Sequence, residues 1–364
     1  MSSRTATTSR RSTRGVRAVL AAGALATLAA GCGSGASDSN SSPSNDAGSS
    51  ASSEAKQDIS VGLITKTETN PFFVKMKEGA TAEAKAKGVK LLTAAGKVDG
   101  DNASQVTAVE NMMAAGVKGI LITPNDTKAI VPTLAKARAK GIVVIALDTP
   151  TEPQDAVDAL FATDNFKAGV LIGQYAKAAM AGKQAKIAAL DLAPGISVGI
   201  LRHNGFLSGF GAAEATADSK NIVNAPSVVC SNDTQGNQAK GQTAMENCLQ
   251  KDPSINLVYT INEPAAAGAY TALKAAGKEK DVMIVSVDGG CAGVKAVQAG
   301  QIAATSQQYP LKMASQGVDA VVAFAKGGAK ASGYTDTGVN LITTKPQTGV
   351  ESEDAAFGTE NCWG

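Results

Sequence analysis

Short runs rich in β-branched residues alternate along this chain with Ala-, Lys- and Glu-rich segments of helical length. The runs are almost continuously apolar, as expected of strands covered on both faces of a parallel sheet. We expect strands at Ile59–Thr65, Val89–Ala94, Gly119–Thr123, Val143–Leu147, Leu160–Thr163, Ala185–Leu192, Ile222–Cys230, Leu257–Ile261, Val282–Val287 and Ala303–Gln307. We expect helices at Pro71–Lys87, Ser104–Ala115, Lys128–Lys140, Lys167–Ala181, Arg202–Ser219, Gln235–Leu249, Pro264–Ala276 and Leu311–Ala325. This pattern predicts an α/β fold with two doubly wound parallel sheets.

Chain length and charge agree with two domains and limit the partners. At 364 residues the chain exceeds one ordinary domain core, so two domains and an N-terminal extension fit it. The formal net charge is +2, and 5 of the 34 Lys and Arg residues lie between Arg4 and Arg17. Without these five the remainder is mildly acidic, so we expect no nucleic-acid partner.

The first 31 residues have the features of an export signal. A basic stretch from Arg4 to Arg17 precedes an apolar run from Ala18 to Ala30, which has the length of a signal-peptide core and is too short to span a membrane. The run ends in Leu28-Ala29-Ala30-Gly31-Cys32, which resembles the lipobox of bacterial lipoproteins, although Leu28 lies one position further from the cysteine than usual. We expect residues 1–31 to be a signal peptide and Cys32 to be lipidated. An ordinary secretory signal is the alternative.

Residues 32–57 have a composition that does not support a packed core. After Cys32 they are mostly Ser, Gly, Ala, Asn and Asp, which predicts a flexible tether. A lipid on Cys32 and this tether would anchor an exported protein to the outer face of the cell membrane.

Four further cysteines suit an exported chain with two disulfides. They have three possible connectivities. We favour Cys230–Cys248, which flanks one strand–helix unit, and Cys291–Cys362, which would pin the C-terminal tail. No cysteine pair has C-x2-C spacing and the chain has one His, so a metal site is not expected.

Polar and aromatic residues gather where the expected strands end, which is where ligands bind in doubly wound sheets. Helix capping explains any one of the polar residues equally well. Capping does not explain Phe72 and Phe73 directly after Asn70-Pro71, for which burial in the first helical turn is the alternative.

Together these residues supply the chemistry that a sugar requires. Phe72 and Phe73 can cover the C–H faces of a sugar ring. Carboxylates such as Asp148 and Asp288 accept hydrogen bonds from hydroxyl groups, and the guanidinium of Arg202 donates them. The amides of Asn70, Asn262 and Gln308 do both. This mixture suits a neutral polyol better than a phosphate or an apolar ligand.

The ordered series of motifs resembles the ribose-type periplasmic binding proteins from about residue 58 to about residue 347. The motifs are Val61-Gly62-Leu63-Ile64-Thr65, Asn70-Pro71-Phe72-Phe73, Met76-Lys77-Glu78-Gly79-Ala80, the Asp148 strand end, Ala162-Thr163-Asp164-Asn165, Asn262-Glu263 and Val287-Asp288-Gly289. The resemblance implies two lobes joined by three crossovers, with a sugar bound between them and closure on binding. The expected lobes are residues 58–163 with 309–340, and residues 164–308 with 341–364.

Carried over residue by residue, the resemblance implies a set of ligand contacts. We expect Lys66, Asn70, Phe72, Phe73, Asp148, Thr149, Asp164, Arg202, Asn232, Asn262, Asp288 and Gln308 to line the site. Three positions depart from the ribose pattern, which usually has Arg at 149, a small hydroxyl residue at 66 and often an aromatic residue at 232. Lys66, Gly289-Gly290-Cys291 and Cys362-Trp363 look closer to the fructose-binding branch. We therefore expect fructose first, and ribose or another pentose or hexose next.

The resemblance also implies a partner, because such proteins deliver their sugar to the membrane permease of an ABC importer. We expect the protein to be a monomer. We also expect it to have no cofactor, since no glycine-rich phosphate-binding motif follows the first strand. A sugar-sensing partner of a membrane receptor is the alternative, because it would also be exported. A repressor is not expected, since the signal and tether occupy the place of its DNA-binding motif.

One motif raises the possibility of an enzyme. Gly195-Ile196-Ser197-Val198-Gly199 matches the pattern of a nucleophile elbow, which would make Ser197 the nucleophile of a hydrolase. The only His, His203, lies six residues later, whereas the elbow's base follows late in the chain after an acidic partner. We interpret the motif as a glycine-rich loop and His203 as a surface or cleft-lining residue, and expect no enzyme.

Overall fold

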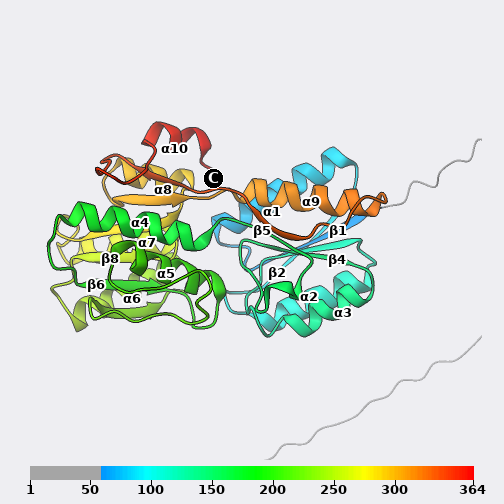
Figure 1. Cartoon of the computed structure of the whole chain (residues 1–364), viewed down its shortest axis with the longest axis horizontal. Coiled ribbons are helices and arrows are strands. Elements are labelled where there is room, and N and C mark those ends of the chain that lie inside the picture. Colours follow the sequence, from blue (N-terminus) through cyan, green and yellow to red (C-terminus); the bar gives the residue numbers. More distant parts are fainter. Residues whose placement is uncertain (1–58) are drawn as a thin grey trace, which may run out of the picture. The chain divides into compact units, whose positions relative to one another are not determined.

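A computed structural model describes residues 59–364 and contains two six-stranded sheets (Figure 1). The predicted signal peptide, Cys32 and the tether lie outside the described residues. The first sheet is parallel throughout and has the order β11 (Gly333–Asp336), β5 (Ala159–Ala162), β4 (Val143–Leu147), β3 (Gly119–Ile122), β1 (Ser60–Thr65), β2 (Lys90–Ala95). Together with the second sheet, this arrangement confirms the predicted α/β class.

The second sheet is parallel except at one edge. Its order is β12 (Asn340–Thr343), β10 (Ala304–Gln307), β9 (Met283–Asp288), β8 (Leu257–Thr260), β6 (Ile187–Asp191), β7 (Val228–Asp233). Strand β12 runs antiparallel to β10. Because β11 belongs to the first sheet and β12 to the second, the chain passes between the sheets three times, after β5, after β10 and after β11.

Helices cover both faces of each sheet. In the first lobe, α1 (Pro71–Lys87) and α9 (Pro310–Ala325) share one apolar core with the sheet, and α2 (Asn102–Ala114) and α3 (Val131–Ala139) share another. In the second lobe, α4 (Asn165–Met180) and α5 (Ser197–Phe210) cover one face. Helices α6 (Gln238–Lys251), α7 (Glu263–Ala275) and α8 (Cys291–Gln298) cover the other, and α10 (Ala355–Asn361) packs beside α8 (Figure 1).

The residues before and after α1 show why the sequence marks this helix clearly. The side chain of Asn70 accepts a hydrogen bond from the backbone N–H of Phe72, and Pro71 takes the first helical position, where its missing N–H costs nothing. The helix ends at Gly88, whose φ of 65° is accessible to glycine without strain. These signals place Phe72 and Phe73 in the first helical turn.

Two predicted elements are displaced in the structure. Helix α5 begins at Ser197 and ends at Phe210, because Gly211 takes a left-handed conformation, whereas the sequence predicted Arg202–Ser219. Strand β7 begins at Val228 rather than at Ile222, since the preceding stretch, with Asn224 and Pro226, forms no strand. The short elements α8, α10, β11 and β12 were not predicted.

The structure contains two disulfides with the pairing favoured from the sequence. Cys230 in β7 is joined to Cys248 in α6, and Cys291 at the start of α8 is joined to Cys362 after α10. The first disulfide lies within one strand–helix unit, while the second attaches the last residues of the chain to the second lobe.

Candidate functional site

A cavity lies between the two lobes, at the carboxyl ends of their strands. Nine of the twelve residues predicted to contact the ligand line it: Lys66, Asn70, Phe72, Phe73, Asp148, Arg202, Asn262, Asp288 and Gln308. They come from the first lobe, the second lobe and the crossover after β10. Residues more than 200 positions apart in the sequence therefore form one ring of polar and aromatic groups.

Arg202 is the centre of this ring, and it is 5% exposed. Its Nε donates to Oδ1 of Asn165 (2.7 Å) and Nη1 to the carbonyl of Ile261 (3.0 Å). Its Nη2 donates to Oδ1 of Asp148 (3.3 Å) and Oε1 of Gln308 (3.2 Å). Because Arg202 is on α5 and Asp148 follows β4, this buried ion pair joins the two lobes.

The two carboxylates of the ring have unusual backbone conformations. Asp148 has a φ of 62° and Asp288 a φ of 146°. Positive φ angles of this kind strain the backbone of any residue other than glycine. Both are 3% exposed. Such strain persists only where the surrounding structure enforces it, and it is typical of functional sites. The strain supports the assignment of both residues to the site.

Asp288 and Glu263 form a pair of buried carboxyl groups at the second lobe. The Oε atoms of Glu263 accept from the backbone N–H groups of Gly289 (2.8 Å) and Gly290 (3.0 Å) and from Oγ1 of Thr305 (2.8 Å). Burial and the charge of Asp288 raise the pKa of Glu263 to about 8. Burial also raises the pKa of Asp288 to about 6, against the opposing charge of Arg202. Through its hydrogen bonds to Gly289 and Gly290, Glu263 fixes the loop that follows Asp288.

A second ion pair borders the cavity on the first lobe. Lys66 is 1% exposed, and its Nζ lies 3.8 Å from Oδ2 of Asp99, which also lines the cavity. Burial raises the pKa of Asp99, and the nearby charge of Lys66 opposes this rise. The ammonium of Lys66 is therefore held beside the cavity by a carboxylate that the sequence analysis did not identify.

Phe72 and Phe73 form an aromatic wall on the first turn of α1. Their rings meet edge to face with centroids 5.3 Å apart. Both side chains line the cavity and also belong to the apolar core beneath α1 and α9. The two interpretations offered for these residues, a sugar contact and a buried helix start, are therefore compatible.

Three predicted residues do not line the cavity. Thr149 is fully buried, and its hydroxyl donates to Oδ2 of Asp148 (2.7 Å), so it orients a lining residue. Asp164 caps α4 by accepting from the backbone N–H of Lys167. The Nδ2 of Asn232 lies 3.2 Å from the sulfur atoms of Cys230 and Cys248, which draws this side chain away from the cavity.

The sequence analysis missed several residues that form or support the site. Asp99, Leu192, Val198 and Ile261 line the cavity. Asn165 is buried and holds both the Nε of Arg202 and, through its Nδ2, the carbonyl of Asp148 (3.0 Å). Asn165 and Glu263 occur in the quoted strand-end motifs, so their position was a usable signal. Nothing in the sequence marks Leu192 or Val198 as more than core residues.

His203 and Ser197 have structural partners. His203 is 2% exposed and does not line the cavity, so its interpretation as a surface or cleft-lining residue is wrong. Burial lowers the pKa of His203, but the hydrogen bond and charge of Asp191, 2.9 Å away, outweigh it and raise that pKa overall. The Oγ of Ser197 donates to the carbonyl of Pro150 (2.6 Å), so it serves as a contact between the lobes.

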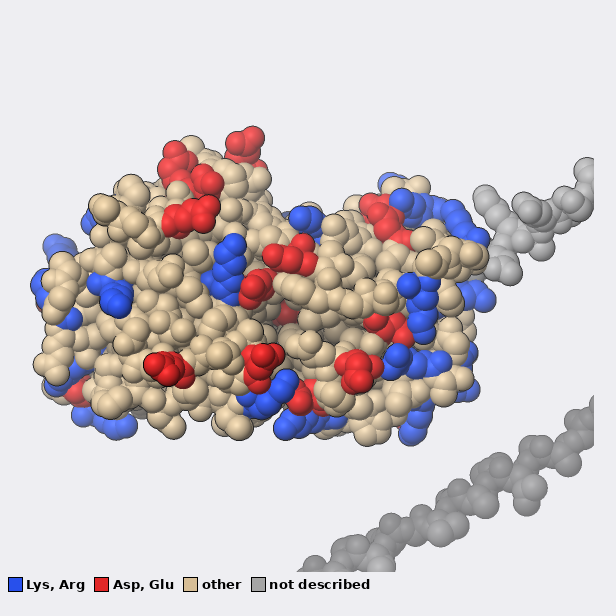
Figure 2. Space-filling view, in the orientation of Figure 1, with Lys and Arg blue, Asp and Glu red and all other residues tan. Residues whose placement is uncertain are grey.

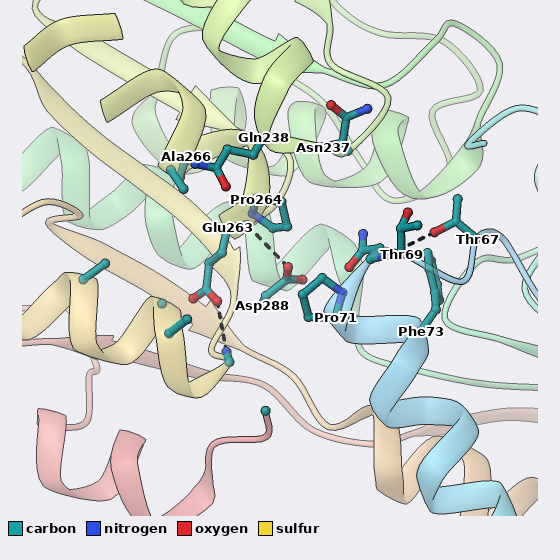
Figure 3. Close-up of a pocket in the computed structure, with 18 of the residues that line it drawn as sticks. Thr67, Thr69, Pro71, Phe73, Asn237, Gln238, Glu263, Pro264, Ala266 and Asp288 are labelled. Carbon is teal, nitrogen blue, oxygen red and sulfur yellow. Dashed lines mark hydrogen bonds between the residues drawn. The ribbon is translucent and has the colours of Figure 1, made fainter. Parts of the chain in front are cut away.

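A wider cavity of about 700 Å³ continues outward from the first one and shares Asn70, Phe73, Asp99 and Asp288 with it. Figure 3 shows Thr67, Thr69, Pro71 and Phe73 on one side of this outer cavity, and Asn237, Gln238, Glu263 and Pro264 on the other. On the surface shown in Figure 2, acidic and basic side chains occur over both lobes. The outer cavity therefore adjoins the ring, and its two sides come from different lobes.

The chain is similar to proteins of one family over most of its length. A family model described as a periplasmic binding protein domain matches residues 61–329. A ribose import binding protein of Bacillus subtilis is 33% identical over 270 residues, which cover 73% of this chain and 83% of that protein. The D-allose-binding periplasmic protein of Escherichia coli is 30% identical over 272 residues, or 73% of this chain and 84% of that protein.

The fold is also similar to solved structures. A periplasmic solute-binding protein of an ABC transporter from Actinobacillus succinogenes, solved with bound D-allose, superposes with a TM-score of 0.68 at 26% identity. The superposition covers 78% of this chain and 97% of that one.

Proposed function

The chain belongs to the periplasmic binding protein family, and on that basis we propose that it is the sugar-binding component of an ABC importer. Its relatives are exported, non-enzymatic solute-binding proteins. The observation that carries the proposal is the ring between the lobes, in which Arg202, Asp148 and Gln308 offer donors and acceptors beside the Phe72–Phe73 wall. This arrangement suits the alternating hydroxyl groups and C–H faces of a monosaccharide.

For the identity of the sugar, we propose fructose first and ribose, allose or another pentose or hexose next. Lys66 supports this order, because its ammonium adds a fixed donor to the cavity where the ribose pattern has a small hydroxyl residue. Thr149 contributes indirectly, since its hydroxyl orients Asp148. The ribose- and allose-binding relatives keep those two sugars in the same class of candidates.

Isothermal calorimetry with a panel of sugars tests the proposal. Fructose, ribose, allose, xylose, galactose and inositol are titrated into the purified protein, and we expect heat of binding from at least one, with fructose the tightest. Tighter binding of ribose or allose would replace fructose and keep the function. The absence of heat from every sugar would overturn the sugar-binding proposal.

We expect the affinity to fall as the pH drops below about 6. Above its pKa of about 6 Asp288 is ionised and accepts hydrogen bonds, as it does from Nε2 of Gln308 at 2.8 Å. Below that pH the carboxyl is protonated, so one oxygen becomes a donor and the negative charge is lost, and sugar affinity should decline by up to about tenfold per pH unit. The ionisable groups around it are Arg202, Asp148 and Glu263, and Glu263, with a pKa of about 8, is protonated below that pH.

Calorimetry from about pH 5 to about pH 8 measures this dependence, and Asp288→Asn is the matched variant because it cannot titrate. The variant should bind weakly at every pH and show a flatter profile. A wild-type affinity that is constant across this range would contradict the role of Asp288 as an acceptor.

Closure of the lobes would allow the importer to distinguish loaded from empty protein. A ligand stabilises the closed form only through contacts that the open form lacks, and contacts from both lobes meet in this cavity. We propose a monomer that presents its closed form to the membrane permease. The proposed lobes are residues 58–163 with 309–340 and residues 164–308 with 341–364, a division that the strand order supports except at Asn340, the first residue of β12.

The protein is exported, as its family is, and we propose that lipid on Cys32 anchors it to the outer face of the cell membrane. Among residues 59–364, no helix is both long enough and apolar enough to cross a bilayer. If lipid on Cys32 is the anchor, Cys32→Ser should move the protein from the membrane fraction to the medium or periplasm, measured by fractionation and immunoblotting. A variant that stays with the membrane would refute the anchor.

A further inference from the structure

The indole of Trp363, the only tryptophan of the chain, lines the outer cavity and contacts two residues of the inner one. It is 6% exposed, and its Nε1 donates to the carbonyl of Gln308 (2.7 Å). Its ring meets that of Phe72 edge to face with centroids 5.5 Å apart. Gln308 and Phe72 both line the sugar cavity. Trp363 thus contacts one polar and one aromatic member of the ring from outside.

The tail that carries Trp363 is fastened to the second lobe. The disulfide Cys291–Cys362 holds Cys362, the residue before Trp363, at the start of α8, and the backbone N–H of Cys291 donates to the carbonyl of Trp363 (2.9 Å). The Nε2 of Gln307, at the end of β10, donates to the carbonyl of Gly358 in α10 (3.0 Å). These contacts fix the position of the tail relative to β10 and α8.

The indole itself packs into the first lobe. It belongs to the apolar core that contains Phe72 and Phe73 of α1 and Met313 of α9. The tail therefore extends from its disulfide in the second lobe to a core in the first. It does so beside Gln308, where the chain crosses from β10 to α9.

We propose that the disulfide-held tail is a clamp, in which Trp363 is a positioning residue that keeps Phe72 and Gln308 in the geometry that binds sugar. This rests on the proposed sugar-binding function of the cavity. The clamp acts across the lobes, so the Cys291–Cys362 disulfide supports affinity as well as stability. The Cys230–Cys248 disulfide has no such role, since it joins β7 to α6 and neither cysteine lines either cavity.

Two tryptophan variants separate the two contacts of the indole. Trp363→Phe keeps an aromatic ring against Phe72 and loses the hydrogen bond to Gln308, so affinity should fall by about threefold to tenfold. Trp363→Ala loses both contacts, and affinity should fall by about thirtyfold or more. Calorimetry with the sugar that binds wild type measures both, and partial rescue by Phe is the result expected of a positioning residue. Equal affinity in Trp363→Ala and wild type would overturn the clamp.

A pair of double variants tests the disulfide. Cys291→Ser with Cys362→Ser should weaken sugar binding by about tenfold or more and shift the fluorescence emission of Trp363 to longer wavelength, because a freed indole meets water. Cys230→Ser with Cys248→Ser is the matched control, which loses stability but keeps the wild-type affinity and emission. Equal loss of affinity in both double variants would reduce the disulfide to general stabilisation and overturn the proposal.

The emission measurement keeps the two proposals distinguishable. If wild type binds no sugar of the panel, the proposed function fails, and the clamp is decided on fluorescence alone. A red shift confined to the Cys291–Cys362 variant then supports a tail held by its disulfide, and an unchanged emission overturns it.

Discussion

Replacement of Arg202 by alanine should abolish most of the sugar affinity. Arg202 places four hydrogen bonds on Asn165, Ile261, Asp148 and Gln308 from a buried position, and it is the charge that faces both Asp148 and Asp288. The alanine variant leaves these carboxylates without a cation between them. Losing a buried charged partner costs about 2–5 kcal/mol of binding, so affinity should fall by about thirtyfold to several thousandfold in calorimetry.

The same substitution should lower the free energy of unfolding by about 3–5 kcal/mol, because it breaks a buried ion pair and leaves one charge unpaired. Arg138→Ala is the matched control. Arg138 pairs with Asp158 (2.9 Å), is half-exposed and lies outside the cavity, and Asp158 keeps Lys330 as a second partner. Denaturant unfolding measures the stability of both variants, and calorimetry measures their sugar affinity. Only Arg138→Ala should keep near-wild-type affinity. Tight binding by Arg202→Ala would move the site elsewhere.

Gly205→Ala should disrupt the second lobe and with it the site. Helices α4 and α5 approach so closely that an added Cβ at Gly205 would overlap the carbonyl oxygen of Phe166. Gly169 and Gly173 on α4, and Gly209 on α5, face the partner helix in the same way. An alanine at 205 must push the helices apart, and overpacking of this kind costs about 1–3 kcal/mol or more. Since Arg202 lies on α5, its guanidinium moves with the helix and sugar affinity falls as well.

Gly199→Ala on the same helix is the control for this effect. Its added Cβ would lie 3.4 Å from the Cβ of Leu192, which is an ordinary van der Waals contact. Alanine is the better helix former by about 1 kcal/mol, so this variant should keep or raise the melting temperature. Thermal unfolding and calorimetry compare the two. Wild-type stability in Gly205→Ala would show that the helices yield without cost.

The strand-end rule recovered most of the site from the sequence because parallel strands bring their carboxyl ends to one edge. Asp148 and Asp288 could be identified in this way from the chain alone, as could Asn262. Asn232 could not be excluded from the site on the sequence alone. Its side chain turns to the Cys230–Cys248 disulfide, and the sequence leaves that cysteine pairing open. Asp164 satisfies the rule equally well and caps α4 instead.

The packing details were beyond the sequence for a different reason. The glycines of α4 and α5 recur four residues apart, which places each pair on one helical face, but glycine is also the residue of turns and helix ends. Only the partner helix shows that Gly169 and Gly205 serve close approach. Asp99 follows the edge strand β2 in a loop with no motif, and its proximity to Lys66 depends on how that loop folds back.

The interleaved order of the strands has a consequence for how this protein reaches its destination. The core beneath α1 requires α9, and β11 completes the same sheet, although both come after most of the second lobe in the chain. An emerging chain therefore cannot finish its first lobe until nearly all of it has been synthesised. We expect this delay to keep the polypeptide loosely folded during translation and thus competent for translocation.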